Sequence, residues 1–193
     1  MDGRKQMKKI ILASGSPRRR ELLTQIGISF EVVKAEGEEK ITTDDPEEAV
    51  KELADRVDAD VVIGADTVVA VDGEIMGKPK DPADAARMIH RIQGRDHEVL
   101  TGVAVILKKG EVETTINFAE TTRVHVFPMT EEEIQSYVAS KEPMDKAGAY
   151  GIQGLFAAYV SGIEGDYNNV VGLPVGRLYQ EVKAIADVDL RTL

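Results

Sequence analysis

Two kinds of hydrophobic pattern alternate along the chain and predict strands that alternate with helices. Apolar runs predict strands over residues 10–14, 30–33, 61–71, 74–76, 99–107, 112–118 and 156–160, and the last but one continues as an alternating pattern to residue 126. Apolar residues at helical spacing predict helices over residues 17–26, 46–57, 82–92, 130–138 and 175–186. Turn dipeptides at Asp72-Gly73 and Lys109-Gly110 join some of the strands as hairpins. The expected fold class is therefore α/β, with a mixed β-sheet flanked by helices.

The stretch SGSPRRR, residues 14–20, places three arginines at the start of a predicted helix. Ser16 is expected to be the N-cap and Pro17 the first helical residue. A helix N-terminus carries partial positive charge and free N–H groups, so basic side chains there are unfavourable unless an anion lies beside them. Arginine is the preferred bidentate partner of phosphate. The pattern therefore favours a phosphate site to which Ser14 adds a hydroxyl donor; the alternative is that the arginines pair with surface acids.

Asp66, in the stretch GADT, interrupts an otherwise apolar strand. Aspartate is poorly tolerated in a strand interior, and a buried carboxylate there needs a metal, a hydrogen-bond network or a function. The alternative is a bulge at Gly64 in which local backbone N–H groups satisfy the carboxylate. Lysines follow in GKPKD, residues 77–81, and three carboxylates precede in EGEEK, residues 36–40. Mg²⁺ takes one or two carboxylates plus substrate phosphates, so EGEEK and Asp66 together could hold it.

The stretch EPMDKAGAYGIQG, residues 142–154, combines three glycines with polar side chains. The glycines indicate a mobile or tightly turned backbone. Polar groups suited to a base edge or a phosphate come from Asp145, Lys146, Tyr150 and Gln153. The alternative is a structural loop that its glycines hold in shape.

Composition narrows the class of protein further. The 193 residues suit one domain, with formal net charge −10 and no cysteine. A nucleic-acid binder usually has a basic footprint, so no nucleic-acid polymer is expected as partner. No apolar run approaches the roughly 18 residues of a membrane span, so we expect no membrane association and a cytoplasmic location. Any anionic ligand must be held by a local cluster of cations against an unfavourable overall field.

Five motifs occur in an order that resembles the Maf-type nucleoside triphosphate pyrophosphatases, also called septum formation inhibitor Maf-like proteins. They are LASGSPRRRELL, GADTVV, GKPKD, EPMDKAGAYGIQG and VVGLP, and they cover residues 10 to about 178. The form AYGIQG resembles the branch acting on dTTP and UTP rather than the branch acting on 7-methyl-GTP. The resemblance implies one domain over residues 1–193, with a twisted mixed sheet in two lobes around a central cleft, often as a homodimer.

The resemblance also implies an activity and a set of site residues. The family hydrolyses a nucleoside triphosphate to the monophosphate and pyrophosphate with Mg²⁺ or Mn²⁺, in house-cleaning of nucleotide pools or in control of septum formation. It implies that Asp66 is the proton acceptor and that Asp66 and Glu39 bind the metal. The implied substrate-binding and specificity residues are Ser14, Arg18, Arg19, Thr67, Lys78 and Gln153.

One departure from the family pattern concerns a lysine in a "KA" pair several residues before GADT. The shorter stretch VKELADRVDADVVIGADT lacks it, and Lys51 or Arg56 could substitute. Two other functions remain open from the sequence. One is a non-catalytic nucleotide sensor that regulates cell division through a partner, and the other is an inosine triphosphate pyrophosphatase with a similar fold and purine specificity.

Overall fold

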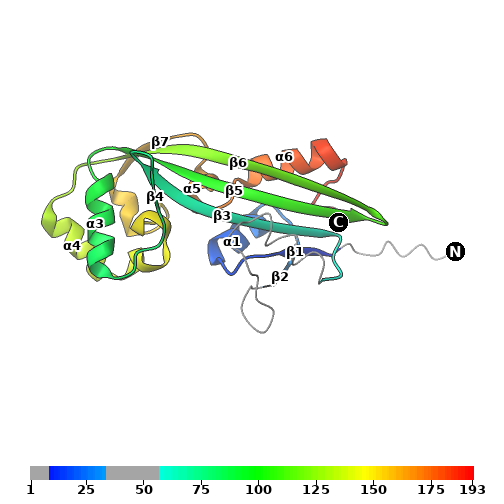
Figure 1. Cartoon of the computed structure of the whole chain (residues 1–193), viewed down its shortest axis with the longest axis horizontal. Coiled ribbons are helices and arrows are strands. Elements are labelled where there is room, and N and C mark those ends of the chain that lie inside the picture. The colour runs from blue at the N-terminus through cyan, green and yellow to red at the C-terminus, as the bar shows by residue number, and fades with distance from the viewer. Residues whose placement is uncertain (1–8, 34–56) are drawn as a thin grey trace. The chain divides into compact units, whose positions relative to one another are not determined.

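The computed structural model of the chain describes residues 9–33 and 57–193 (Figure 1). The candidate metal ligand Glu39 and the possible substitutes Lys51 and Arg56 lie outside the described residues, as does all but the last residue of the helix predicted over residues 46–57. Within the described part of the chain, no helix is both long enough and apolar enough to cross a lipid bilayer.

The described residues form one mixed sheet flanked by helices, which confirms the predicted α/β class. Its strands are β1 (Ile10–Leu12), β2 (Glu31–Val32), β3 (Val61–Val71), β4 (Glu74–Met76), β5 (Asp96–Lys109), β6 (Val112–Val126) and β7 (Val160–Glu164). The strand order is β2-β1-β3-β5-β6-β7, and β4 pairs with β3. Strand β1 is parallel to β2 and β3, whereas the β3–β4 and β6–β7 pairs are antiparallel.

The helices fall close to their predicted positions. They are α1 (Pro17–Gln25), α3 (Pro82–Ile92), α4 (Glu131–Ala139), α5 (Tyr167–Val171) and α6 (Val175–Ala186), with the short 3₁₀ helices η1 (Glu142–Asp145), η2 (Ala147–Ala149) and η3 (Leu155–Tyr159). The predicted strand over residues 156–160 is wrong, because those residues form most of η3 and the strand begins only at Val160. Helix α5 was not predicted, since five residues are too few to show a helical period.

Local signals explain where several elements start and turn. The predicted hairpin at Asp72-Gly73 is confirmed, and both residues adopt the positive φ values, 52° and 75°, that a tight primed turn requires. Helix α4 begins with a capping box, in which Thr130 and Glu133 each accept a backbone N–H of the other. These hydrogen bonds involve neighbours in sequence only, which is why the sequence predicts them.

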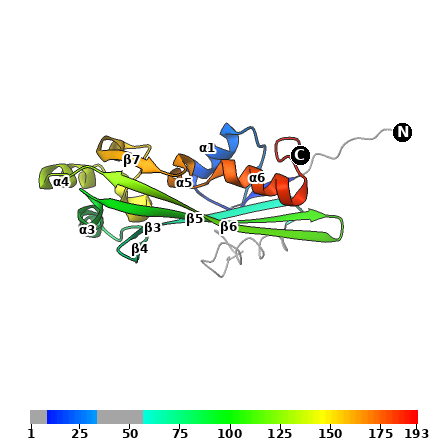
Figure 2. The same cartoon turned by 90° about the horizontal axis from the view of Figure 1, so that it is seen from above.

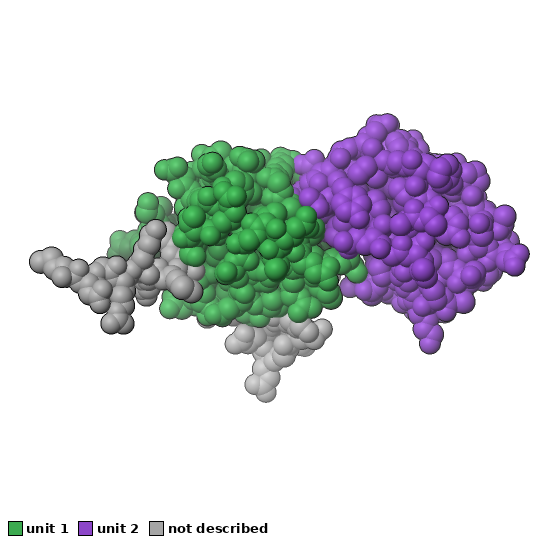
Figure 3. All heavy atoms as spheres, turned by 180° about the vertical axis from the view of Figure 1, so that it is seen from behind, with its two compact units in different colours: residues 1–66, 102–119, 175–193 green, residues 67–101, 120–174 purple. Residues whose placement is uncertain are grey.

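The chain divides into two compact units, coloured separately in Figure 3. Unit 1 contains residues 1–66, 102–119 and 175–193, and unit 2 contains residues 67–101 and 120–174. Each unit gathers segments far apart in the sequence, because the long strands β3, β5 and β6 each contribute residues to both.

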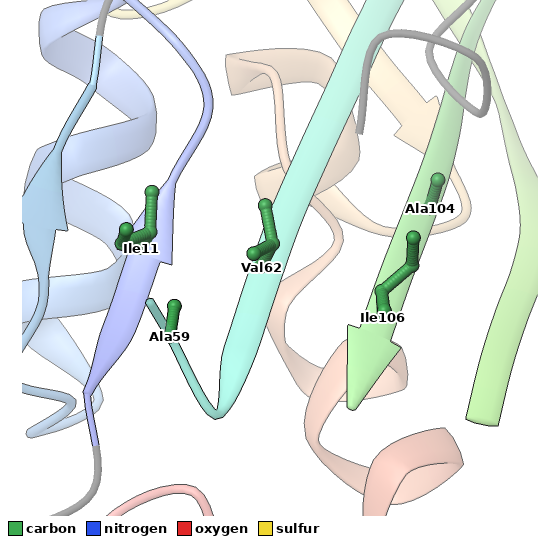
Figure 4. Packing of buried hydrophobic residues seen from close by; sticks show 5 residues of the cluster. All are labelled: Ile11, Ala59, Val62, Ala104 and Ile106. Carbon is green, nitrogen blue, oxygen red and sulfur yellow. The ribbon is translucent and has the colours of Figure 1, made fainter. Parts of the chain in front are cut away.

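One core cluster of unit 1 lies on three neighbouring strands. Ile11, Val62 and Ile106 come from β1, β3 and β5, and they pack with Ala59 and Ala104 into one buried cluster (Figure 4). Helices α1 and α6 lie along the same side of the sheet in this unit (Figure 2). The buried strands β1 and β3 carry the chain to the candidate site residues of unit 1.

Unit 2 packs its helices around a small aromatic core. Helix α3 contacts α4 and the 3₁₀ helices η1 and η2. Phe156 is fully buried, and its ring lies against the rings of Tyr137, Tyr150 and Tyr159 at centroid distances of 4.7–5.6 Å. Aromatic pairs at such distances add to the stability that burial alone provides. This cluster lies directly beneath the glycine-rich segment that the sequence analysis singled out.

Candidate functional site

The loop between β1 and α1 holds Ser14 in a buried position, 9% exposed. Its hydroxyl oxygen accepts a hydrogen bond from the backbone N–H of Ser16 and another from Arg19 Nη1, both at 3.2 Å. A serine hydroxyl that accepts twice keeps its own hydrogen for donation. Ser14 therefore orients one arginine and can donate to a ligand oxygen at the same time.

The positive charge at the N-terminus of α1 is not offset by an acidic residue in the first helical turn. Ser16 is the N-cap and Pro17 the first helical residue, as predicted, but the Ser16 side chain makes no capping hydrogen bond. The first turn carries no acidic residue, and Arg18, Arg19 and Arg20 are all half-buried there. Basic groups at this end of a helix oppose its dipole, so the arrangement suits an anionic ligand better than it suits the helix.

Arg19 and Asp66 influence each other electrostatically within unit 1. Burial lowers the pKa of Arg19 to about 10, while the negative charge of Asp66 opposes that fall and Arg18 adds to it. Strand pairing explains the proximity, because β1 and β3 run parallel with Leu12 opposite Ile63. Ser14 and Asp66 both follow these partners in the same direction, since β1 ends at Leu12 while β3 continues past Asp66. The structure thus brings Ser14, Arg19 and Asp66 to one place in unit 1.

The expected burial of Asp66 is wrong. Asp66 is exposed, and β3 continues through GADT as an uninterrupted strand from Val61 to Val71. The strand is buried from Val61 to Gly64, becomes accessible over residues 65–68, and is buried again at Val69 and Val71. The carboxylate is therefore in reach of solvent, and no buried network has to compensate it.

Thr67 follows Asp66 and belongs to unit 2, where its hydroxyl is held by protein groups. Its Oγ1 lies 2.9 Å from Oγ1 of Thr101 and 3.4 Å from the carbonyl oxygen of Gly172. Thr101 is completely buried and in turn donates to the carbonyl of Asn169 at 3.2 Å. Sequence reasoning missed Thr101, since a threonine in an apolar strand gives no signal until its partner is known.

The loop between β4 and α3 exposes Lys78. Buried Pro79 anchors this loop beside it, and the carbonyl of Gly77 accepts the N–H of Gly148 at 3.0 Å. Gly148 has φ 65°, and a Cβ there would lie 2.7 Å from Val69 Cγ2. The motif GKPKD is therefore joined to the glycine-rich segment by a backbone hydrogen bond that needs glycine at position 148.

Gln153 is exposed on unit 2, as a residue that reads a ligand must be. Two other candidates in the same segment have structural partners instead. Tyr150 is buried, and its hydroxyl lies 2.7 Å from His97 Nε2. Lys146 Nζ donates to the carbonyl of Glu142 and to the Asp145 carboxylate, both at 2.7 Å. The prediction that Tyr150 and Lys146 are available to a ligand is therefore not supported, and Gln153 is the exposed polar side chain of GIQG.

His97 is a further buried polar residue that the sequence analysis did not single out. Desolvation lowers its pKa to about 4, with a smaller opposing effect of Asp96, so the imidazole is neutral near pH 7. Its ring also lies edge-on to Tyr150 at 5.1 Å between centroids. His97 and Tyr150 thus form a neutral buried pair that ties β5 to the glycine-rich segment.

Within residues 9–33 and 57–193, no group of three or more His, Asp or Glu side chains is placed to hold a metal ion. Mg²⁺ in phosphate chemistry needs only one or two carboxylates beside substrate oxygens. The exposed carboxylate of Asp66 has the chemistry that such a ligand requires.

The sequence matches known proteins over nearly its whole length. The family model described as "Maf-like protein" matches residues 9–185. A dTTP/UTP pyrophosphatase of Agathobacter rectalis is 50% identical, covering 93% of this chain and 98% of that protein. Proteins of the same name from Lachnoclostridium phytofermentans and Bacillus cytotoxicus are each 50% identical, covering 92% of this chain and 95% of each relative.

A solved structure, the Staphylococcus aureus Ham1 protein, matches with a TM-score of 0.42 and 14% identity, covering 62% of this chain and 72% of that one. Likeness at that level carries no argument about function. The arginine-rich start of α1 and the exposed Asp66 nearby form an arrangement that suits an anionic ligand. On the extent of the sequence match, the chain belongs to the Maf-like protein family.

Proposed function

We propose that this protein hydrolyses dTTP and UTP to the nucleoside monophosphate and pyrophosphate. The observation that carries the proposal is the group formed by Ser14, Arg19 and Asp66, in which a hydrogen-bonded arginine lies within the electrostatic influence of an exposed carboxylate. Family relatives named dTTP/UTP pyrophosphatases, 50% identical over more than nine-tenths of this chain, support the choice of substrate.

The triphosphate binds at the start of α1. Its negative charge compensates Arg18 and Arg19 and the partial positive charge at the start of the helix. Ser14 donates its remaining hydrogen to a phosphate oxygen while it keeps Arg19 oriented. Because these groups are held by the protein before the ligand arrives, little reorganisation is needed when negative charge develops.

Asp66 accepts the proton of the attacking water. The water oxygen forms a bond to the α-phosphorus, the bond from that phosphorus to the bridging oxygen of the β-phosphate breaks, and pyrophosphate leaves with the electron pair of that bond. An exposed carboxylate within hydrogen-bond reach of the attacking water can take up the proton that the water loses. Within unit 1, the positive charges of Arg18 and Arg19 offset the charge that accumulates on the phosphate oxygens.

A divalent metal ion is part of the proposal. Asp66 supplies one carboxylate ligand for Mg²⁺ or Mn²⁺, and Glu39, which lies outside the described residues, supplies a second. When bound, such an ion neutralises phosphate charge and polarises the phosphoryl oxygens. Thr67 and Gln153, together with Arg18, set the choice of base.

Pyrophosphate release from dTTP and UTP by the purified protein with Mg²⁺ tests the activity, with dCTP, ITP and 7-methyl-GTP as comparisons. We expect dTTP and UTP to be hydrolysed with the highest kcat/KM. Removal of the metal with a chelator should abolish turnover. Preferred hydrolysis of ITP would instead assign a purine pyrophosphatase, and binding of dTTP without pyrophosphate release would assign a nucleotide sensor.

The variant Asp66→Asn tests the assigned proton acceptor. It removes the charge and basicity but keeps the shape, so kcat should fall by about 10³-fold while the fold is retained. Asp187→Asn is the matched control, because Asp187 is exposed in unit 1 at positive φ, a conformation that asparagine also adopts readily. A fall of less than about tenfold, equivalent to about 1.4 kcal/mol of barrier, would exclude Asp66 as the proton acceptor.

A further inference from the structure

Gln153 lies at the corner of a tight turn. The N–H of Gly154 donates to the carbonyl of Gly151 at 3.2 Å, which closes a four-residue turn with Ile152 and Gln153 at its centre. Ile152 is 8% exposed and anchors the turn, while Gln153 is exposed. The direction of the Gln153 side chain is therefore set by whatever holds the two ends of this turn.

The Glu142 carboxylate holds the C-terminal end of the turn. Its Oε2 accepts the N–H of Leu155 at 2.9 Å, and its Oε1 accepts the hydroxyl of Tyr137 at 3.2 Å. Burial and the nearby Glu142 charge raise the pKa of Tyr137, so this phenol remains a neutral donor. Both carboxylate oxygens thus have fixed donors from two different elements, and the side chain cannot swing away without losing both hydrogen bonds.

Glycine at position 154 lets the carboxylate come this close. A Cβ at Gly154 would lie 2.5 Å from Glu142 Oε2, a separation that real Cβ contacts do not show. Gly154 has φ −100° and ψ −152°, so its backbone conformation is not what requires glycine. The requirement is space for Glu142.

The side chain of Lys146 packs closely against the N-terminal end of the turn. A Cβ at Gly151 would lie 2.7 Å from Lys146 Cε, and the lysine cannot easily retreat because its Nζ is hydrogen-bonded to Glu142 and Asp145. Glu142 therefore takes part at both ends, with its side chain at one and its backbone carbonyl at the other. The glycines of GIQG make room for these two charged side chains.

We propose that Glu142 is a positioning residue for substrate selection, which clamps the turn and thereby fixes Gln153 for reading the base. This role rests on the proposed function, in which Gln153 contributes to the choice of dTTP and UTP. Glu142 does not touch the substrate. It acts by keeping an exposed amide in one orientation, because a hydrogen bond that discriminates between bases requires a donor and an acceptor already in place.

The chemistry of the clamp predicts which substitutions are tolerated. In Glu142→Gln, the amide oxygen can still accept the Leu155 N–H, and the amide NH₂ can donate to the Tyr137 hydroxyl, which also accepts hydrogen bonds. Glutamine therefore preserves the geometry without the charge. Glu142→Ala removes both hydrogen bonds, and Gly154→Ala displaces the carboxylate by occupying its space.

The test compares kcat/KM for dTTP, UTP, dCTP and ITP in these three variants and the wild-type protein. Glu142→Ala and Gly154→Ala should reduce the preference for dTTP over dCTP or ITP at least tenfold, mainly through KM for dTTP, whereas Glu142→Gln should stay within about threefold of wild type. Matched controls are Glu132→Ala, an exposed carboxylate on α4, and Gly176→Ala, where an added Cβ meets nothing within 4 Å. Both controls should retain wild-type selectivity.

Hydrogen exchange of the Leu155 amide provides a readout independent of activity. Its protection should be lost in Glu142→Ala and Gly154→Ala and kept in Glu142→Gln. Unchanged protection in Glu142→Ala would overturn the clamp even if the enzyme is inactive on every nucleotide. Suppose that the wild-type enzyme prefers dTTP and that Glu142→Ala loses the protection of the Leu155 amide but keeps the wild-type selectivity. That result would overturn the positioning role and leave the proposed function intact. Failure of wild type to hydrolyse any nucleotide would overturn the proposed function, and with it the role in selection.

Discussion

The hydroxyl oxygens of Thr67 and Thr101 lie 2.9 Å apart, which connects the residue after Asp66 to a completely buried side chain of β5. Since Thr101 donates its own hydrogen to the carbonyl of Asn169, it accepts from Thr67. The orientation of the Thr67 side chain is thus fixed by a residue that no ligand can reach.

Thr101→Val should therefore alter substrate selection from a distance. Valine has nearly the same shape, so the core stays filled. Thr67 loses the shorter of its two hydrogen bonds and keeps the longer one, to the carbonyl of Gly172, while the buried carbonyl of Asn169 loses the donor Thr101. We expect a loss of about 1–3 kcal/mol in the free energy of unfolding and a changed ratio of kcat/KM for dTTP and dCTP. Thr101→Ser restores the hydroxyl and should recover selectivity. Steady-state kinetics with both nucleotides checks this, and an unchanged ratio in Thr101→Val would rule out the connection.

Arg19→Gln should stabilise the free protein while it weakens nucleotide binding. The substitution removes a half-buried positive charge from the start of α1, where it opposes the helix dipole, so the free energy of unfolding should rise by about 0.3–1 kcal/mol. In wild type, dTTP at about 100 times its Kd should raise stability by about 2.7 kcal/mol, and the variant should lose most of that gain at equal concentration. Thermal unfolding with and without dTTP measures both effects.

The control for that experiment is Arg87→Gln. Arg87 forms an exposed ion pair with Asp84 on α3, far from α1 in sequence, and surface pairs contribute little to stability. Its stabilisation by dTTP should equal that of wild type. If Arg19→Gln lowers stability and keeps full protection by dTTP, the arginines at α1 serve the fold and not the ligand.

His97 should make the protein sensitive to mild acid. Its pKa of about 4 in the folded protein lies below the ordinary value of 6.5, so between these pH values the unfolded chain binds a proton that the folded protein does not. The contribution of His97 to the free energy of unfolding is therefore fully present above pH 6.5. It falls as the pH drops towards 4, by about 3 kcal/mol at most. Urea unfolding at pH 8 and pH 5 measures the loss.

His97→Gln isolates that contribution, because the variant keeps the neighbours Asp96 and His125, and its glutamine does not titrate. The stability difference between wild type and variant should shrink as the pH falls from 8 to 5. A difference that stays constant over this range would show that His97 is protonated equally in the folded and unfolded states.

Thr130→Ala should affect stability alone. The variant loses the side-chain oxygen that accepts the Glu133 N–H in the capping box of α4, which should cost about 1 kcal/mol. Thr130→Ser keeps that acceptor and should restore most of the loss. Chemical denaturation measures the cost, and kcat/KM for dTTP should not change, since the box lies at the surface of unit 2. A fall in kcat/KM would connect α4 to the site.

The sequence predicts the elements whose determinants are local. The capping box at Thr130, the hairpin at Asp72-Gly73 and the proline-led start of α1 each depend on neighbouring residues, and each is confirmed. The strand expected over residues 156–160 fails because Phe156 is apolar for a different reason: it fills an aromatic cluster in a 3₁₀ helix. An apolar run predicts that a segment is buried, but it does not predict which residues the segment packs against or which secondary structure it adopts.

The same division holds for the candidate site. By itself, the order of five motifs determined the family. The residue types at positions 14, 19 and 66 predicted the kind of ligand, because charge and hydrogen-bonding capacity belong to the side chain. Only the tertiary structure decided that Asp66 is exposed and that the Tyr150 hydroxyl is hydrogen-bonded to His97. It also decided that the Glu142 carboxylate lies where a side chain at Gly154 would be. These depend on contacts between residues distant in sequence or separated by a turn, and such contacts exist only once the backbone is folded.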